Sequence, residues 1–413
     1  MGGAGRAPAG CYNAPQQQGA RMQKNGDSRW SMLGVLFIAR TVMGCQFQTV
    51  ASTAPFLADA FGINFAQLGT LIGLFMLPGI FIALPGGVLG QRFGAKHVTL
   101  AGLLLMAAGG ALMAAGWSFL VLAAGRLISG AGAVLINVLI TKMVADWFAG
   151  REIVTAMAIL IASWPLGLAL GLLLFTPLAA AESWGAVMSL GALLSLASLL
   201  MVAAIYRDPP AAGTQPLPAL HLNLTPREWL AVSCAGFVWM TYNVGYIVLI
   251  SFLPSLFTAR GVSSAQASSI VSFLGWTLIP LVPLTGYLAE RFHRPNLFLV
   301  GGLVLAGLAS AALPFAEQPI YVFAVMVIVI GAPAGLIMAL PAQALRAQSR
   351  AAGMGVYFTW YYAGMALLPG AASLARDLTG SPAAPALFAA AMMVLALAGL
   401  AGFRRARMPT LTA

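Results

Sequence analysis

The sequence predicts an all-α membrane protein in which twelve transmembrane helices form two pseudo-symmetric six-helix bundles. Of its 413 residues, 60% are hydrophobic and only 8% are charged, and the mean hydropathy is +0.91. Apolar runs repeatedly exceed the roughly 18 residues that a membrane-spanning helix needs. A short motif also recurs once in each half of the chain. This composition excludes a water-soluble domain.

The apolar runs define the twelve spans, which are separated by short polar segments. The predicted spans cover residues 31–57, 67–89, 98–116, 119–141, 153–176, 184–205, 229–257, 266–288, 297–315, 319–341, 352–374 and 383–402. Because the number of spans is even, we expect both termini on the same side of the membrane.

The polar segments divide the chain into domains. Residues 1–29 are polar and lack the apolar core of a signal peptide, so we expect a disordered cytoplasmic tail. A Pro-rich linker at 207–227 joins an N-terminal bundle at 30–206 to a C-terminal bundle at 228–403. Residues 404–413 form a short cytoplasmic C-tail.

The repeated motif indicates a duplication of the half-chain. Gly87-Val-Leu-Gly-Gln-Arg-Phe93 returns as Gly286-Tyr-Leu-Ala-Glu-Arg-Phe292 with an offset of 199 residues, and Arg151 and Arg350 share this offset. An even number of spans separates equivalent positions, so the pseudo-twofold axis lies along the membrane normal. In each copy the glycine is expected to let helices approach closely, and the charged residues to form a clamp on the water side.

The positions of the basic residues predict the orientation in the membrane. Of the 21 Lys and Arg residues, 17 lie on the side of the termini, and only Arg260 and Arg376 lie on the opposite side. The positive-inside rule therefore places both termini in the cytoplasm of a multi-pass inner-membrane protein. This distribution also explains the net charge of +11 and the pI of about 10.1 without nucleic acid as a partner.

The motifs resemble those of the major facilitator superfamily over residues 30–403. The segment from Gly87 through Gln91, Arg92 and Gly94 to Lys96 is similar to the loop 2–3 signature of that family. The resemblance implies gating or coupling roles for Gly87, Gln91, Arg92, Gly94, Arg126, Gly130, Gly286, Glu290 and Arg291. Gln91 stands where the family usually has Asp, which puts the charge-relay role of that position in doubt, whereas Glu290 keeps the acid in the second half.

Further segments resemble one bacterial branch of the superfamily, which includes cyanate and nitroimidazole transporters. They are 44–48, 54–57, 77–79 and 84–87. The resemblance implies a monomeric carrier with two halves that rock about a central site. The Gly-rich signature of nitrate/nitrite porters is absent from residues 162–167 and 359–364.

Arg40 and Arg126 are the only Lys, Arg, Asp, Glu or His residues within the predicted spans. A buried cation is costly unless it meets a partner or water, so each is a functional-site hypothesis. Arg40 lies about 14 Å into span one at 1.5 Å per residue. It either binds an anion through its guanidinium or is satisfied by backbone carbonyls. For Arg126 an anchoring role in helix packing competes with a role in coupling.

The other charged groups lie outside the spans. None of the ten acids and none of the three histidines falls inside a predicted span. A carrier of neutral solutes that is coupled to protons usually needs an embedded carboxylate. The chain is therefore expected to bind a small anionic substrate. The coupled species is expected to be a proton, which travels on the substrate or through peripheral groups, or a counter-anion.

Aromatic and amide side chains supply the rest of the predicted cavity. Those of span seven are expected to face Gln46 and Gln48 across the axis, and the alternative for any single aromatic is a lipid-facing or packing position. With Arg40, the candidates are Gln46, Gln48, Asn137, Trp164, Trp239, Tyr242, Asn243, Tyr246, Trp276, Tyr357, Trp360 and Tyr361.

These observations favour a secondary active transporter that moves a small organic or inorganic anion by alternating access. The alternative is an efflux pump for amphipathic drugs or metabolites, which the aromatic spans favour. An enzyme is not expected, because no nucleophile and base lie together at membrane depth. The three cysteines lack metal-ligand spacing, and neither a metal nor a cofactor is expected.

Overall fold

The computed structural model describes residues 14–148, 152–209, 224–346 and 349–406. Every secondary-structure element in these residues is a helix. The elements in chain order are α1 (Ala14–Ser52), α2 (Ala54–Phe61), α3 (Phe65–Leu74), α4 (Gly79–Phe93), α5 (Ala95–Ala114), α6 (Phe119–Trp147), α7 (Ile153–Ala181), α8 (Trp184–Ile205), α9 (Pro226–Thr258), α10 (Ser264–Arg291), α11 (Pro295–Ala312), η1 (Leu313–Phe315), α12 (Pro319–Val329), α13 (Ala334–Met338), α14 (Leu340–Ala344), α15 (Arg350–Thr379) and α16 (Ala384–Ala406).

The predicted fold class is confirmed. In the described parts of the chain, 11 segments are long and apolar enough to cross a membrane. The remaining predicted span is occupied by α15, whose run of Tyr and Trp side chains lowers its hydropathy. Three spans are divided by breaks in the helix: span one into α1 and α2, span two into α3 and α4, and span ten into α12, α13 and α14.

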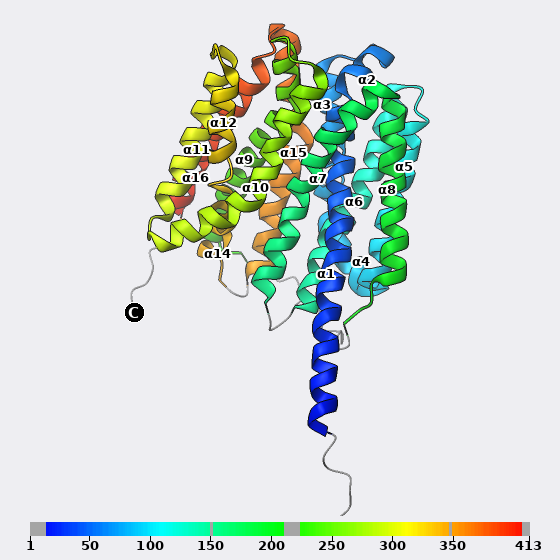
Figure 1. The fold of residues 1–413 in the computed structure, drawn as a ribbon. Coiled ribbons are helices and arrows are strands. Elements are labelled where there is room, and N and C mark those ends of the chain that lie inside the picture. Colours follow the sequence, from blue (N-terminus) through cyan, green and yellow to red (C-terminus); the bar gives the residue numbers. More distant parts are fainter. Residues whose placement is uncertain (1–13, 149–151, 210–223, 347–348, 407–413) are drawn as a thin grey trace, which may run out of the picture.

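The helices form two bundles. Figure 1 shows α1–α8 on one side of the molecule and α9–α16 on the other. In the first bundle α5 packs against α6 and α8, and in the second α9 packs against α15 and α16. The start of α1 and the end of α16 lie at the same end of the molecule, which we call the tail end (Figure 1). The opposite end is called the far end.

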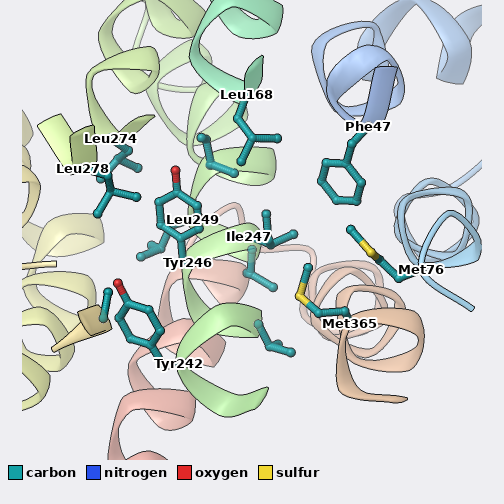
Figure 2. Packing of buried hydrophobic residues seen from close by; sticks show 14 of the residues in the cluster. Phe47, Met76, Leu168, Tyr242, Tyr246, Ile247, Leu249, Leu274, Leu278 and Met365 are labelled. Carbon is teal, nitrogen blue, oxygen red and sulfur yellow. The ribbon is translucent and has the colours of Figure 1, made fainter. Parts of the chain in front are cut away.

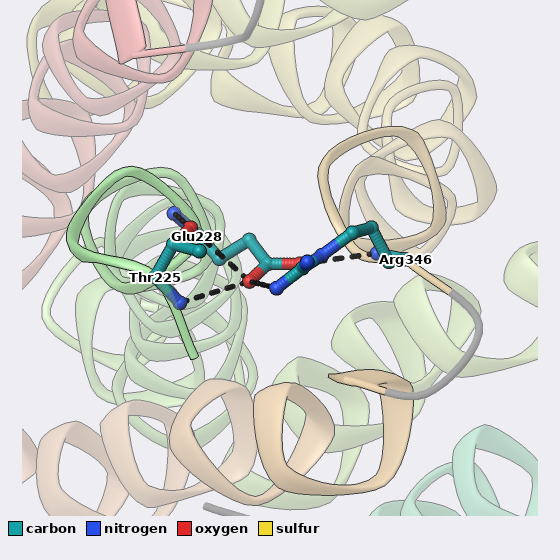
Figure 3. Close-up of polar contacts among 3 residues, drawn as sticks. All are labelled: Thr225, Glu228 and Arg346. Atoms are coloured by element: carbon teal, nitrogen blue, oxygen red, sulfur yellow. Dashed lines mark hydrogen bonds and ion pairs between the residues drawn. The ribbon is translucent and has the colours of Figure 1, made fainter. Parts of the chain in front are cut away.

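One ion pair in each half anchors the first long helix at the tail end. Arg29 pairs with Glu152, which precedes α7, with 2.8 Å between Nη2 and Oε2. In the second half the buried Glu228 accepts hydrogen bonds from Nε and Nη2 of Arg346, at 3.0 and 2.9 Å (Figure 3). Arg29 and Glu228 are 199 residues apart. The duplicated position therefore keeps its anchoring role although the sign of its charge is reversed.

The two halves meet closely at the far end. Gly69 and Gly73 of α3 lie against α15, and a Cβ added at Gly73 would overlap the carbonyl oxygen of Ala366. A second contact joins α7 to α10, where the hydroxyls of Thr176 and Ser268 are 2.9 Å apart. Glycine is needed on α3 because the backbones of α3 and α15 lie too close together to leave room for a side chain between them.

Polar groups reinforce this closure. The Asp377 carboxylate, in the last turn of α15, accepts hydrogen bonds from the backbone N–H groups of Phe65 and Ala66, at 3.2 and 2.7 Å. An acid at this position also interacts favourably with the helix dipole at the N-terminus of α3. The neighbouring Arg376 guanidinium lies 3.6 Å from the centre of the Phe65 ring and donates to Ser255 of α9. The contacts with Phe65 and Ala66 tie the C-terminal half to the N-terminal half.

The glycines of the repeated motif do not make the expected close approach. A Cβ added at Gly87 or Gly286 would meet no atom within 4 Å, whereas one at Gly90 would overlap Leu139. Glu290 is exposed, and it takes part in none of the three ion pairs between described residues. Since both glycines lie toward the tail end, these findings fit a state in which the halves are apart there.

The other motif residues are placed as follows. The Arg92 guanidinium lies over the neighbouring Phe93 ring at 5.4 Å, and Arg291 donates to the Tyr287 hydroxyl one turn earlier at 3.4 Å. Gly94 ends α4 with a φ of 86°, a conformation that favours glycine. The side chains of Gln91 and Arg350, and the whole of Arg151, lie outside the described residues.

The predicted tails and linker coincide only in part with the helix boundaries. α1 begins at Ala14, within the segment predicted to be a disordered tail, because Gln, Arg, Met and Lys are good helix formers. Residues 1–13, 210–223 and 407–413 lie outside the described chain. The Pro-rich linker gives way to α9 at Pro226, where Thr225 and Glu228 form a capping box.

We predict that Gly73→Ala shifts the protein toward a state that is open at the far end. The added methyl group overlaps a backbone oxygen, and overpacking of this kind costs about 1–3 kcal/mol, enough to change a two-state population roughly tenfold. Spin labels on α3 and α15 at the far end should report longer distances in the variant. Gly301→Ala, where nothing lies within 4 Å, serves as the control. Unchanged distances in Gly73→Ala would contradict the assigned closure.

Candidate functional site

A cavity of about 500 Å³ lies between the two halves. Helices α1, α6 and α7 line it from the N-terminal half, and α9, α10, α13 and α15 line it from the C-terminal half. Its lining continues toward the tail end as far as Thr141, Ala158 and Met338. Because the far end is closed by α3, α15, α7 and α10, access to the cavity is from the tail end.

Breaks in two spans border the cavity. Phe75 and Met76 lie in the turn that separates α3 from α4, and Ala334 and Gly335 follow the turn that separates α12 from α13. Irregular backbone at membrane depth is tolerated where it lines a cavity. Pro165 and Pro283 also line the cavity, but α7 and α10 run through them without interruption.

The structure brings eight of the thirteen predicted binding residues together on this cavity. They come from both halves of the chain. These eight are Arg40, Asn137, Trp164, Trp239, Tyr242, Asn243, Tyr246 and Tyr361. Tyr362, next to Tyr361 on α15, lines the same cavity.

The expectation that Gln46 and Gln48 face span seven is wrong. Gln46 is buried inside the N-terminal bundle, where its Nε2 donates to the carbonyl of Met106 at 2.7 Å and its Oε1 accepts from Ser195 at 2.6 Å. Gln48 is fully buried against Gly171 of α7. Both side chains are buried within their own bundle, although the Gln48 amide has no hydrogen-bond partner among the described residues. Their polarity therefore does not indicate which side of α1 faces the axis.

The other three predicted residues also lie off the cavity surface. Tyr357 is fully buried behind Trp239, and its hydroxyl lies 3.6 Å from the sulfur of Met338. Trp360 is exposed on the outside of α15 and packs edge-to-face against Phe237 at 5.9 Å. Trp276 is half-buried on α10 and is not part of the lining. These aromatics belong to packing or lipid-facing surfaces.

Arg40 presents part of its guanidinium to the cavity. Its Nε donates to Oδ1 of Asn137 at 3.1 Å, and its Nη1 donates to the carbonyl of Leu160 at 2.7 Å and to Ser163 at 3.3 Å. No hydrogen bond of Nη2 to a described residue is found, and no described ion pair includes Arg40. The guanidinium is therefore held in place by neutral groups with its charge uncompensated.

Arg126 is satisfied in a different way. It is fully buried, and its three nitrogens donate to the carbonyls of Leu71, Gln46 and Phe47 at 2.9, 3.0 and 3.0 Å. The Phe75 ring lies 4.6 Å from the guanidinium carbon. Gly130, one turn later, packs against the backbone of Phe75. The anchoring interpretation of Arg126 and Gly130 therefore agrees with the geometry.

A polar chain crosses the cavity between the halves. Asn137 of α6 accepts from Arg40 and donates through Nδ2 to the Tyr362 hydroxyl of α15 at 3.2 Å. Both ends of the Asn137 amide are thus occupied. This chain links the cation of the N-terminal half to a phenol of the C-terminal half.

Stacked aromatic rings form the opposite wall. Trp239 stacks on Tyr242 and Tyr361, with ring centres 5.9 and 6.3 Å apart and interplanar angles of 26° and 30°. Tyr357 stacks on Trp239 from behind at 6.2 Å and 19°. The Tyr242 hydroxyl donates to the carbonyl of Ile330 at 2.7 Å. These offset stacks fix the orientation of the indole.

Two structural features have no signal in the sequence. Apolar lining residues such as Met43 and Leu278 have the same residue types as the residues of the packed core, so the sequence does not distinguish the two sets. The far-end groups Arg376 and Asp377 fall outside the predicted span, which ends at 374. The helical phase in fact continues to Thr379.

Two bundles of membrane-spanning helices around one shared cavity are the architecture of secondary transporters. The sequence profile of the Major Facilitator Superfamily matches residues 36–369 and, in a second match, 229–412. The chain therefore belongs to the Major Facilitator Superfamily, and its class is that of transporters and not enzymes.

Sequence relatives are distant. A hexuronate transporter of Bacillus subtilis (strain 168) is 21% identical over 252 residues, which cover 59% of this chain and 60% of that protein. A 2-nitroimidazole transporter of Escherichia coli (strain K12) is 27% identical over 58% of this chain and 61% of that protein. A 3-(3-hydroxy-phenyl)propionate transporter of the same organism is 25% identical over 68% and 69%. The first two alignments thus span about three fifths of those relatives.

Solved structures share the fold over nearly the whole chain. A bacterial homolog of the human lysosomal transporter Spinster, in an inward-facing and unoccupied conformation, has a TM-score of 0.73 at 18% identity and covers 93% of this chain and 99% of that one. A D-xylose–proton symporter has a TM-score of 0.73 at 15% identity and covers 90% and 97%. Similarity at this level of identity shows the fold alone.

We predict that Arg126→Met destabilises the protein more than Arg40→Met does. The first variant leaves three buried carbonyls without their donor, at about 1–3 kcal/mol for each group that stays unpaired. The second leaves groups that border a cavity, where water can replace the guanidinium. Thermal unfolding of both variants in the same detergent tests this order. Equal melting temperatures would contradict the anchoring role of Arg126.

Proposed function

We propose that the protein is a secondary active transporter that moves a small anion, organic or inorganic, by alternating access. The observation that carries this proposal is the partly unpaired guanidinium of Arg40 on the cavity surface. An uncompensated cation in a low-dielectric site is strongly stabilised by an anion, and the fork of a guanidinium suits a carboxylate or a small oxyanion.

The groups around Arg40 support this choice of charge. Its described hydrogen-bond partners are an amide oxygen, a carbonyl and a hydroxyl, all of them neutral acceptors. They hold the guanidinium without neutralising it. The cavity lining contains no Asp or Glu among the described residues, so a cationic substrate would meet repulsion and no compensating acid.

The arrangement of the halves supports alternating access. Contacts of α3 with α15 and of α7 with α10 close the far end, while the cavity extends toward the tail end. If the positive-inside rule places the tail end in the cytoplasm, this is an inward-facing state of an inner-membrane protein. The opposite state requires the contacts of Asp377 and Arg376 with α3 to break.

The names of the relatives are consistent with an anionic substrate. Hexuronate and 3-(3-hydroxy-phenyl)propionate, which two of the relatives transport, are both carboxylates. The lining offers no carboxylate or histidine among the described residues to carry a proton. We therefore propose that a coupled proton travels on the substrate or through groups outside the cavity, or that a counter-anion is exchanged. The working unit is proposed to be a monomer in the lipid bilayer.

A second candidate function is efflux of amphipathic compounds. The aromatic wall formed by Trp239, Tyr242 and Tyr361 favours it, because such compounds gain from apolar contact. Binding of this kind would not depend on the charge of Arg40. Drug susceptibility of cells that express the protein, compared with cells that lack it, separates this function from anion transport.

We predict that Arg40→Lys and Arg40→Met lose anion binding, with the greater loss in the Met variant. A charge-assisted hydrogen bond contributes about 1.5–3 kcal/mol, so removal of the charge should weaken binding by roughly one to two orders of magnitude. The Lys variant keeps the charge but loses the fork.

A thermal-shift screen with acetate, benzoate, glucuronate, cyanate and nitrate, followed by calorimetric titration, measures this effect. Met43→Leu, which lines the same cavity without changing its charge, is the matched control. The proposal fails if the wild-type protein binds no anion, or if Arg40→Met binds as tightly as Met43→Leu.

A further inference from the structure

The cavity contains more recognition groups than a small inorganic anion would use. Besides Arg40, its lining includes a stacked aromatic wall, and two of the lining residues, Trp239 and Tyr246, have an indole N–H and a hydroxyl that are buried without a partner among the described residues. We propose that the site takes an aromatic carboxylate whose ring carries a second polar substituent. This inference rests on the proposed anion transport and names the chemical class of the anion.

The size of the cavity favours an organic ligand. Its volume of about 500 Å³ falls in the range of roughly 300–1,000 Å³ that holds drug-sized ligands. Much of the surface is apolar, with Met43, Phe75 and Leu278 among the lining residues. A nitrate or cyanate ion at Arg40 would leave this surface without contact, whereas a ring would cover it.

Several polar groups of the lining are already occupied and cannot serve a sugar acid. Asn137 has both ends of its amide occupied, by Arg40 and Tyr362. The Asn243 amide donates to the carbonyl of Trp239 one turn earlier on α9. The Tyr242 hydroxyl is bound to Ile330. A ligand with four or five hydroxyl groups would bury several of them unpaired, which is costly.

The duplication places the cation and the aromatic wall opposite each other. Arg40 and Trp239 are 199 residues apart, so they occupy the same position in the two halves, on α1 and on α9. Both line the cavity. A carboxylate at Arg40 therefore directs the attached ring across the axis toward the indole face, where offset stacking is favourable.

The second polar group of the ligand has a defined place. Tyr246 lies seven residues after Trp239, on the same face of α9 and about 10 Å further toward the far end at 1.5 Å per residue. Its side chain is 4% exposed, and its hydroxyl has no partner among the described residues. In Figure 2 this hydroxyl points toward α7 and α10, where Leu168 and Leu274 are labelled. A hydroxyl, carbonyl or nitro oxygen on the ring would accept its hydrogen bond once the Tyr246 side chain turns from this position toward the cavity.

The first test compares ligands on the full-length wild-type protein. Calorimetric titration uses benzoate, 3-hydroxybenzoate, 4-hydroxybenzoate, 3-nitrobenzoate, cyclohexanecarboxylate, glucuronate and nitrate. We expect at least one substituted benzoate to bind about tenfold more tightly than benzoate, and benzoate to bind more tightly than cyclohexanecarboxylate. Tightest binding of glucuronate or nitrate in an Arg40-dependent manner overturns this inference but leaves anion transport intact. Absence of binding by every anion overturns both.

The second test uses Tyr246→Phe, which removes only the hydroxyl. We expect it to abolish the advantage of the substituted benzoate and to leave the affinity for benzoate within about twofold. Tyr242→Phe is the matched control, because it removes a hydroxyl that is already bound within the protein, so both ligands should change by the same factor. An equal loss of both ligands in Tyr246→Phe, with melting temperature unchanged, would overturn the proposed contact.

Discussion

The burial of guanidinium groups in an apolar protein is the constraint on which the site depends. Arg126 and Arg40 meet it in different ways. Arg126 is enclosed by three backbone carbonyls and two aromatic rings, so it ties α6 to α1 and α3 and offers nothing to a ligand. Arg40 is held by three neutral acceptors at one edge and borders the cavity at another. Because no acid neutralises it among the described ion pairs, its positive charge dominates the electrostatics of the cavity.

The contacts between helices also differ between the two ends of the molecule. Gly69 and Gly73 let α3 and α15 meet at the far end, and Asp377 completes the hydrogen bonds of the α3 N-terminus. A helix end satisfied by a side chain from the other half can be uncovered again, since water can replace the carboxylate. By contrast, Gly87 and Gly286 toward the tail end have no close neighbour. The two ends of the molecule are therefore in opposite states, as alternating access requires.

Much of the fold could be predicted, because the length of an apolar run can be read from the sequence without knowledge of tertiary contacts. Eight of the predicted residues line the cavity, among them Arg40 and Trp239. The wrong predictions concern which face of a helix points toward the cavity. Gln46 and Gln48 satisfy the rule that amides avoid lipid, but they do so inside the N-terminal bundle. Tyr357 and Trp360 lie on the same helix as Tyr361, and only tertiary packing decides which of them reaches the cavity. Helix breaks and the end of α15 depend likewise on contacts between distant segments.

The duplication also explains why the site is asymmetric. Equivalent positions hold a cation in one half and an indole in the other, so a ligand that reaches both positions contacts both halves. A ligand shifts a conformational equilibrium only as far as its affinity differs between the states. A solute that touched Arg40 alone would bind much the same whether the halves were rocked inward or outward. The affinity of a solute that touches both halves depends on their relative position, because its contacts with Trp239 change as the halves move. In the proposed mechanism, the opposition of charge and ring would therefore couple occupancy of the site to the movement of the halves.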